Sequence, residues 1–190
     1  CAPHVKLTGE VGIIRLIDAI KYKGGTRVTM VCGFRALKDY RMKESNIREI
    51  SRMLSAKPEE SAQAVKRLQD EAKSWREKLI QTQSRAMEQI LENLPEHVEN
   101  YLVFKKDVDK NVARRFVDEG KSKCQGICGI FLGNDEDGYR YILGSESVDL
   151  KAFSKTFHET LGGKGGGKGE MVQGTVNASE ETIRNYIEKK

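Results

Sequence analysis

The sequence contains no apolar run approaching the roughly 18 residues that a membrane-spanning helix requires. Its first residues, Cys1 to His4, lack the charged and apolar regions of a secretory signal peptide. Four cysteines in 190 residues are too few for a disulfide framework. These absences exclude membrane proteins and disulfide-rich secreted proteins, and we expect a cytoplasmic protein without membrane contact. Because the sequence does not begin with methionine, we also expect it to be a piece of a longer protein.

The bulk composition is that of a highly charged globular protein. With 38% hydrophobic residues the chain can bury a core, and its formal net charge of +5 permits a polyanionic partner. The 33 basic and 28 acidic residues are mixed along the chain, so most of them are expected to lie on solvated helix faces.

The N-terminal segment is predicted to form a β-hairpin followed by a helix. An apolar segment over residues 11–22 and a β-branched segment over 27–32 flank a Gly-Gly pair, which allows the positive φ angles of a tight turn. Apolar residues then recur at steps of three and four up to a break at 55–58, which is typical of a helix. Ser55 is the expected cap of the next helix, and Pro58 suits a first helical turn.

A second, long helix is predicted to run to about Asn93, and it needs a partner. Its apolar residues alternate by three and four over about three heptads. These residues are Val65, Leu68, Ala72, Trp75, Leu79, Thr82 and Ala86. Either the preceding helix folds back on this face, or a second copy of the chain pairs with it.

The C-terminal half returns to mixed structure. Strands are predicted near residues 101–104, 126–132 and 139–143, and helices over 108–120 and 148–161. A glycine tract and a terminal helix capped by Ser179 complete the chain. The expected class is therefore α+β: a hairpin in residues 1–42, long helices in 43–95 as a helical hairpin or coiled coil, and an α/β domain with a glycine-rich loop in 96–190.

The glycine tract is the first candidate site. Consecutive glycines let the backbone approach an anion, and two lysines add charge, which favours a phosphate-binding loop. The tract lacks the Walker pattern, because Gly169 follows Lys168 where a hydroxyl residue would hold magnesium. A flexible linker is the alternative, and both interpretations stay open on these residues alone. The tract consists of Gly162, Gly163, Lys164, Gly165, Gly166, Gly167, Lys168 and Gly169.

The remaining candidates are individual side chains. Cys1 and His4 are of zinc-ligand type, but two ligands do not make a site. The spacing predicts a core position for Cys128 and a semi-exposed thiol at Cys124. Two further histidines, His97 and His158, are interpreted as surface or helix-face residues.

A cluster of basic residues in the C-terminal half is either a nucleic-acid-binding face or a solvated helix face, and the solvated face is favoured. The cluster consists of Lys105, Lys106, Lys110, Arg114, Arg115, Lys121 and Lys123.

Two segments near the start, Cys1 to Gly12 and Val31 to Leu37, resemble the second metal-binding motif of the editing domains of alanyl-tRNA synthetases and free-standing AlaX proteins. In that family a His-x3-His pair and a Cys-x3-His pair hold one zinc, and the domain hydrolyses serine or glycine wrongly attached to alanine tRNA. The resemblance assigns the histidine ligand to His4 and places the ligand cysteine one position before Cys1. This chain contains no His-x3-His pair, so at most one zinc ligand lies in it.

From Asn100 to the end the sequence resembles the glycine-rich domain of alanyl-tRNA synthetases and DHH-type phosphoesterases, most specifically over Gly162 to Gly174. In the synthetases this region follows a helical dimerisation segment and contributes to tRNA binding. The resemblance therefore implies a fragment of an alanyl-tRNA editing hydrolase that binds alanine-type tRNA and forms a homodimer. The alternative is a non-catalytic coiled-coil module that binds a nucleotide or another phosphorylated ligand.

Overall fold

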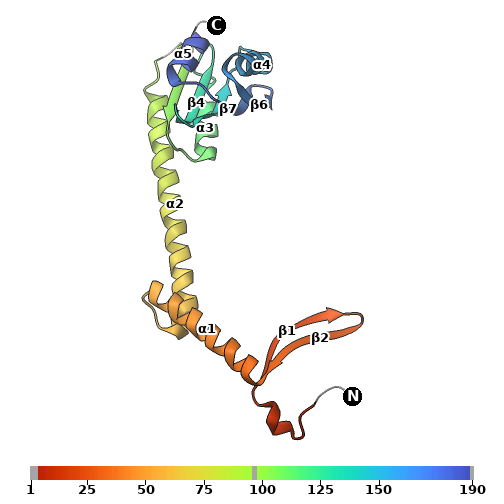
Figure 1. Ribbon diagram of the computed structural model, residues 1–190. Coiled ribbons are helices and arrows are strands. Elements are labelled where there is room, and N and C mark those ends of the chain that lie inside the picture. Colours follow the sequence, from red (N-terminus) through yellow and green to blue (C-terminus); the bar gives the residue numbers. More distant parts are fainter. Residues whose placement is uncertain (1–3, 96–97, 189–190) are drawn as a thin grey trace. The chain divides into compact units, whose positions relative to one another are not determined.

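The computed structural model describes residues 4–95 and 98–188, and the chain divides into two compact units, residues 1–73 and 74–190 (Figure 1). No helix in the described ranges is long and apolar enough to cross a membrane.

The first unit contains the predicted hairpin. After a short 3-10 helix, η1 (Thr8–Val11), strands β1 (Ile14–Tyr22) and β2 (Gly25–Cys32) pair antiparallel with a bulge after Leu16. Lys23 and Gly24 form the turn with φ angles of 43° and 80°, which the glycine adopts without steric cost. The hairpin prediction is confirmed.

Two helices follow, joined by a tight connection. Helix α1 (Gly33–Met53) leads through η2 (Pro58–Glu60) into the 32-residue helix α2 (Ser61–Glu92). Pro58 is the first residue of η2, as expected. The predicted capping role of Ser55 is wrong, because Ser55 has a φ of 49° and lies in the connection while Lys57 precedes η2.

The apolar face predicted on α2 remains largely open to solvent. Leu68, Trp75 and Leu79 are 56%, 67% and 56% exposed, and Val65 is 38% exposed. All four side chains therefore count as exposed in the described part of the chain. A face of this kind leaves pairing with a second copy available.

The second unit is built on a five-stranded sheet with the strand order β3-β4-β5-β7-β6. Strands β3 (Tyr101–Lys105) and β4 (Cys128–Asn134) are parallel. Strands β5 (Gly138–Gly144), β6 (Gly163–Lys168) and β7 (Met171–Val176) pair antiparallel with their neighbours. The predicted α+β class is confirmed. The predicted domain boundaries after residues 42 and 95 stay a prediction.

Helices cover the two faces of this sheet unequally. Helix α3 (Lys110–Gly120) and the end of α2 pack on one face around Ile130 and Ile142. Helices α4 (Leu150–Leu161) and α5 (Glu180–Glu188) pack on the other face around Tyr141 and Leu143. Because α3 contacts β4 and β5, the outer strands β7 and β6 keep one face without a covering helix.

The glycine tract corrects one detail of the predicted fold. Residues 163–168, which we expected to form a loop, are the edge strand β6 and are paired with β7 along their whole length. Gly162 and Gly169 bound this strand with φ angles of 68° and 67°. The tract is therefore neither a loop nor a flexible linker.

Candidate nucleic-acid interface

Strand β6 sorts its glycines and lysines onto different faces of the sheet. Side chains alternate along a strand, so Gly163, Gly165 and Gly167 point toward the face that α4 covers. A Cβ atom added to Gly163 would lie 2.8 Å from the His158 ring, and one added to Gly165 would lie 3.0 Å from the Tyr141 hydroxyl. Only glycine lets this strand approach the two aromatic side chains so closely.

These two side chains form a hydrogen bond beneath the strand. The Tyr141 hydroxyl lies 2.5 Å from His158 Nε2. Burial raises the pKa of Tyr141 to about 12 and lowers the pKa of His158, so both groups are neutral at pH 7. His158 is thus not a simple surface residue, because it is half-buried and holds Tyr141 against Gly165 and Gly174.

The opposite face of β6 carries the two lysines. Register places Arg140, Thr175 and Lys164 in one row across β5, β7 and β6. The next row contains Ile142, Gln173 and Gly166. Lys168 lies two residues beyond Gly166 on the same face of the strand.

Helix α3 turns this open face into a groove. A cavity of about 520 Å³ is lined by Lys110, Arg140, Gln173 and Thr175 among others. A second cavity of about 260 Å³ is lined by Arg114 and Lys168, and both cavities share Ile142 and Gln173. Together they form one channel with α3 on one side and β6 on the other, which we call the α3–β6 groove.

Five basic side chains border or line the α3–β6 groove. All five are exposed, and none takes part in an ion pair between described residues. The five are Lys110, Arg114, Arg140, Lys164 and Lys168. Asp107 and Asp109 also line the larger cavity, and Asp109 caps α3 by accepting a hydrogen bond from the Asn111 amide. The groove therefore has a surplus of unpaired positive charge.

The basic cluster predicted from sequence is divided by the structure. Lys110 and Arg114 face the groove, whereas Arg115 is paired with Glu88 and Glu119. Lys121 is paired with Asp118 and Glu170, and these carboxylates raise the pKa of Lys121.

Lys123 is occupied as well, because it donates a hydrogen bond to the Leu91 carbonyl. Arg115 is exposed on α3, which agrees with the favoured interpretation of a solvated helix face, whereas Lys121 and Lys123 follow the end of α3 and are held by their partners. For Lys110 and Arg114 the binding interpretation gains support.

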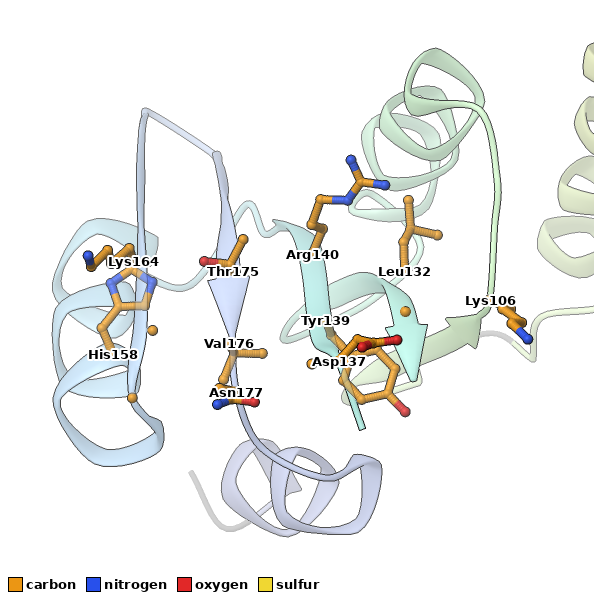
Figure 2. Close-up of a pocket in the computed structure, with 14 residues that line it drawn as sticks. Lys106, Leu132, Asp137, Tyr139, Arg140, His158, Lys164, Thr175, Val176 and Asn177 are labelled. Carbon is orange, nitrogen blue, oxygen red and sulfur yellow. The ribbon is translucent and has the colours of Figure 1, made fainter. Parts of the chain in front are cut away.

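A third cavity opens at the end of the sheet where β5 and β6 begin. It measures about 690 Å³ and is lined by Lys106, Arg140, Lys164 and His158. Figure 2 shows Lys164 and His158 on one side, Lys106 on the other and Arg140 between them. This cavity joins the groove because Leu132, Arg140 and Thr175 line both, and Lys164 stands beside Thr175 at the border between them.

The predicted zinc ligand, His4, belongs to no cluster of three or more metal-ligand side chains among the described residues. His4 is exposed, and its Nδ1 lies 3.1 Å from the Val5 carbonyl oxygen. Cys1 and His97 lie outside the described residues. Within residues 4–95 and 98–188 no three or more His, Cys, Asp or Glu side chains converge as a metal site. The described residues thus do not fit a complete zinc site.

The described cysteines are free thiols. Cys32 is partly buried and Cys128 is fully buried, as predicted for Cys128. Cys124 is only 9% exposed, so the prediction of a semi-exposed thiol is wrong. Both Cys124 and Cys128 pack in the core beneath α3.

Sequence reasoning missed Arg140 and the hydrogen bond between Tyr141 and His158. The alternation Tyr139-Arg140-Tyr141 within a predicted strand was a usable signal, because it places the arginine opposite two aromatic residues. The register that aligns Arg140 with Lys164 depends on the pairing of β5 with β7, and no local pattern specifies it.

Comparison with known proteins shows which families this chain resembles. Residues 98–189 match the DHHA1 domain. The alanine–tRNA ligase of Magnetococcus marinus is 31% identical over 186 residues, covering 90% of this chain and 21% of the ligase. The alanine–tRNA ligase of Sulfurisphaera tokodaii is 30% identical over 203 residues, covering 97% of this chain and 22% of the ligase. The alanine–tRNA ligase of Nitrosospira multiformis is 25% identical over 205 residues, covering 98% of this chain and 24% of the ligase.

The chain thus spans about a fifth to a quarter of the length of these relatives. Its similarity extends over both units, since at least 90% of the chain is aligned in each case. The chain is distantly similar to the C-terminal region of alanine–tRNA ligases, including their DHHA1 domain.

Proposed function

We propose that this chain is the tRNA-binding and dimerising part of an alanyl-tRNA editing protein. The observation that carries the proposal is the α3–β6 groove, where five unpaired cations gather in a chain whose relatives are alanine–tRNA ligases. Lysine and arginine side chains that neutralise phosphates release counterions, which gives affinity for an RNA backbone. The partner is alanine-type tRNA.

The editing reaction belongs to the intact protein. The resemblance of the N-terminal segment implies a zinc-dependent deacylation of serine or glycine from alanine tRNA, with His4 as one zinc ligand. The described residues supply no further ligands around His4, so we assign no hydrolytic step to them. The chain by itself is expected to bind tRNA without deacylating it.

The exposed face of α2 supports pairing of two chains. Burying an aromatic and two leucine side chains removes apolar surface from water at about 25 cal/mol per Å². Trp75, Leu68 and Leu79 are each more than half exposed, so such a gain is available to a second copy. We therefore propose a homodimer formed through α2.

The alternative function, binding of a nucleotide or other phosphorylated small molecule, draws support from the 690 Å³ cavity. Lys106, Arg140 and Lys164 could neutralise a phosphate there, with His158 as a polar neighbour. Such a ligand would occupy the cavity alone and would not need Lys168 or Arg114 in the groove. This difference separates the two functions.

Binding of alanine-type tRNA to this chain tests the proposal. Fluorescence anisotropy is measured at about 50 and 200 mM salt with Lys164→Ala, Lys168→Ala and the control Lys155→Ala. Lys155 is exposed on α4, which covers the other face of the sheet.

Affinity that falls with salt and with both groove substitutions, but not with the control, supports tRNA binding. Absence of binding at the lower salt concentration overturns it. Loss of tRNA binding on addition of free nucleotide, without an effect of Lys168→Ala, favours the small-molecule alternative.

A further inference from the structure

We infer that the α3–β6 groove holds a single unpaired RNA strand, with α3 supplying a second basic wall opposite β6. This inference rests on the proposed function and specifies which form of RNA enters the site. It assigns binding roles to Lys110, Arg114, Arg140 and Gln173, in addition to the two lysines of the glycine tract.

The width of the groove follows from the sheet. Arg140 and Lys164 lie in one row with Thr175 between them, so their backbones are two strand spacings apart. Neighbouring strands are spaced about 4.8 Å, which gives a floor roughly 10 Å wide. A single nucleotide strand fits a floor of this width, whereas a double helix would touch only the rims.

The cations are arranged along both sides of the groove. Lys110, Arg140 and Lys164 lie at one end, and Arg114 and Lys168 lie at the other. The four residue steps from Lys164 to Lys168 span about 13 Å of strand, which matches roughly four stacked nucleotides. One strand lying lengthwise would meet positive charge from both walls.

The floor offers groups that suit exposed bases. Gln173 and Thr175 are exposed on β7, and no described side chain forms a hydrogen bond with either side chain. A carboxamide donates to and accepts from base edges, and these edges are accessible only in unpaired RNA. Gly166 completes the floor, and a Cβ atom added there would have no neighbour within 4 Å.

That open space at Gly166 provides a sharp test. Its φ is outside the left-handed region and nothing crowds its Cβ position, so Gly166→Val is compatible with strand β6. The valine would raise the floor of the groove without altering any charge. Ligands that reach the floor would lose affinity, while ligands that contact only the rims would not.

The experiment measures anisotropy of the full chain with a labelled oligouridylate of about 12 nucleotides and with an RNA duplex of the same length. We expect the single strand to bind about tenfold more tightly, and Gly166→Val to abolish that preference. Arg114→Gln on the second wall is expected to weaken the single strand about fivefold, with Lys155→Gln as the charge-matched control. Circular dichroism confirms that each variant is folded.

The inference is overturned if the duplex binds as tightly as the single strand, or if folded Gly166→Val binds oligouridylate like the parent chain. Binding of tRNA that depends on Lys164 and Lys168, without binding of oligouridylate, leaves the proposed function intact and refutes the inference. Binding of oligouridylate that depends on groove residues, without binding of tRNA, refutes the proposed function and leaves the single-strand groove intact. The two failures are therefore distinguishable.

Discussion

Replacing Gly165 with alanine tests whether the glycine tract is a packed strand. The new methyl group would lie 2.6 Å from the Gly174 Cα atom and 3.0 Å from the Tyr141 hydroxyl, and it would also meet the Gln173 carbonyl oxygen. Two of these neighbours are backbone atoms of β7, which cannot rotate away. Strand β6 would have to separate from β7.

The expected cost is that of overpacking a well-packed site, about 1–3 kcal/mol. Gly166→Ala provides the matched comparison, because its methyl group meets nothing within 4 Å. That substitution is expected to stabilise the fold by about 0.4–1 kcal/mol through the unfolded chain. The two alanine variants should therefore differ by roughly 1.4–4 kcal/mol, which corresponds to a difference in Tm of at least about 3 °C.

Differential scanning calorimetry of the two variants measures this difference. Amide hydrogen exchange locates it, because Gly165→Ala should speed exchange in β7, while Gly166→Ala should not. Equal stabilities, with equal protection of β7, would refute the packed strand. A flexible tract would instead gain stability from alanine at both positions.

Three further predictions concern other parts of the chain. Trp75→Asp is expected to convert a dimer into a monomer in sedimentation equilibrium, whereas the control Gln81→Asp, on the other side of α2, is expected to stay dimeric. Pairing through this face of α2 is contradicted if both variants are monomeric or both are dimeric. Burial lowers the pKa of His158, so the imidazole binds a proton more readily in the unfolded chain than in the folded one, and stability is lost as the pH falls through about 6.5. Urea unfolding between about pH 7.5 and 5.5 should show this loss of stability, and His158→Gln should reduce the loss. Ser61→Ala removes a buried 2.9 Å contact with the Ser51 hydroxyl and is expected to cost about 1 kcal/mol in urea unfolding, and no change would contradict that contact.

Local sequence patterns were sufficient for most elements of the fold. The hairpin follows from Gly24 and its β-branched flanks, and the helices follow from three-and-four apolar spacing. The glycine tract was misjudged because glycine has low intrinsic strand propensity and is common in loops. What makes it a strand is pairing with β7 over Tyr141, a tertiary contact that propensity does not report.

The candidate site was predictable only in part for the same reason. Lys164 and Lys168 were found from the tract itself, and Lys110 and Arg114 from a cluster of basic residues. Their convergence depends on how α3 packs beside the sheet, and Arg140 enters through the register of β5. Sequence identifies the charges, but strand order decides which of them share a groove.

Successive residues of β6 face opposite sides of the sheet, so packing and RNA binding depend on different residues of the same strand. Gly163 and Gly165 allow close packing over the hydrogen-bonded His158 and Tyr141, and Gly167 packs against the backbone of Met171 and Val172, so substitutions at these glycines should first affect stability. Lys164, Gly166 and Lys168 face the groove, so substitutions there should first affect RNA binding. Because the strand period is two, a shift of β6 by one residue would turn the lysines onto the aromatic pair and lose both properties together. Pairing with β7 therefore links the stability of the domain to the presentation of its charges.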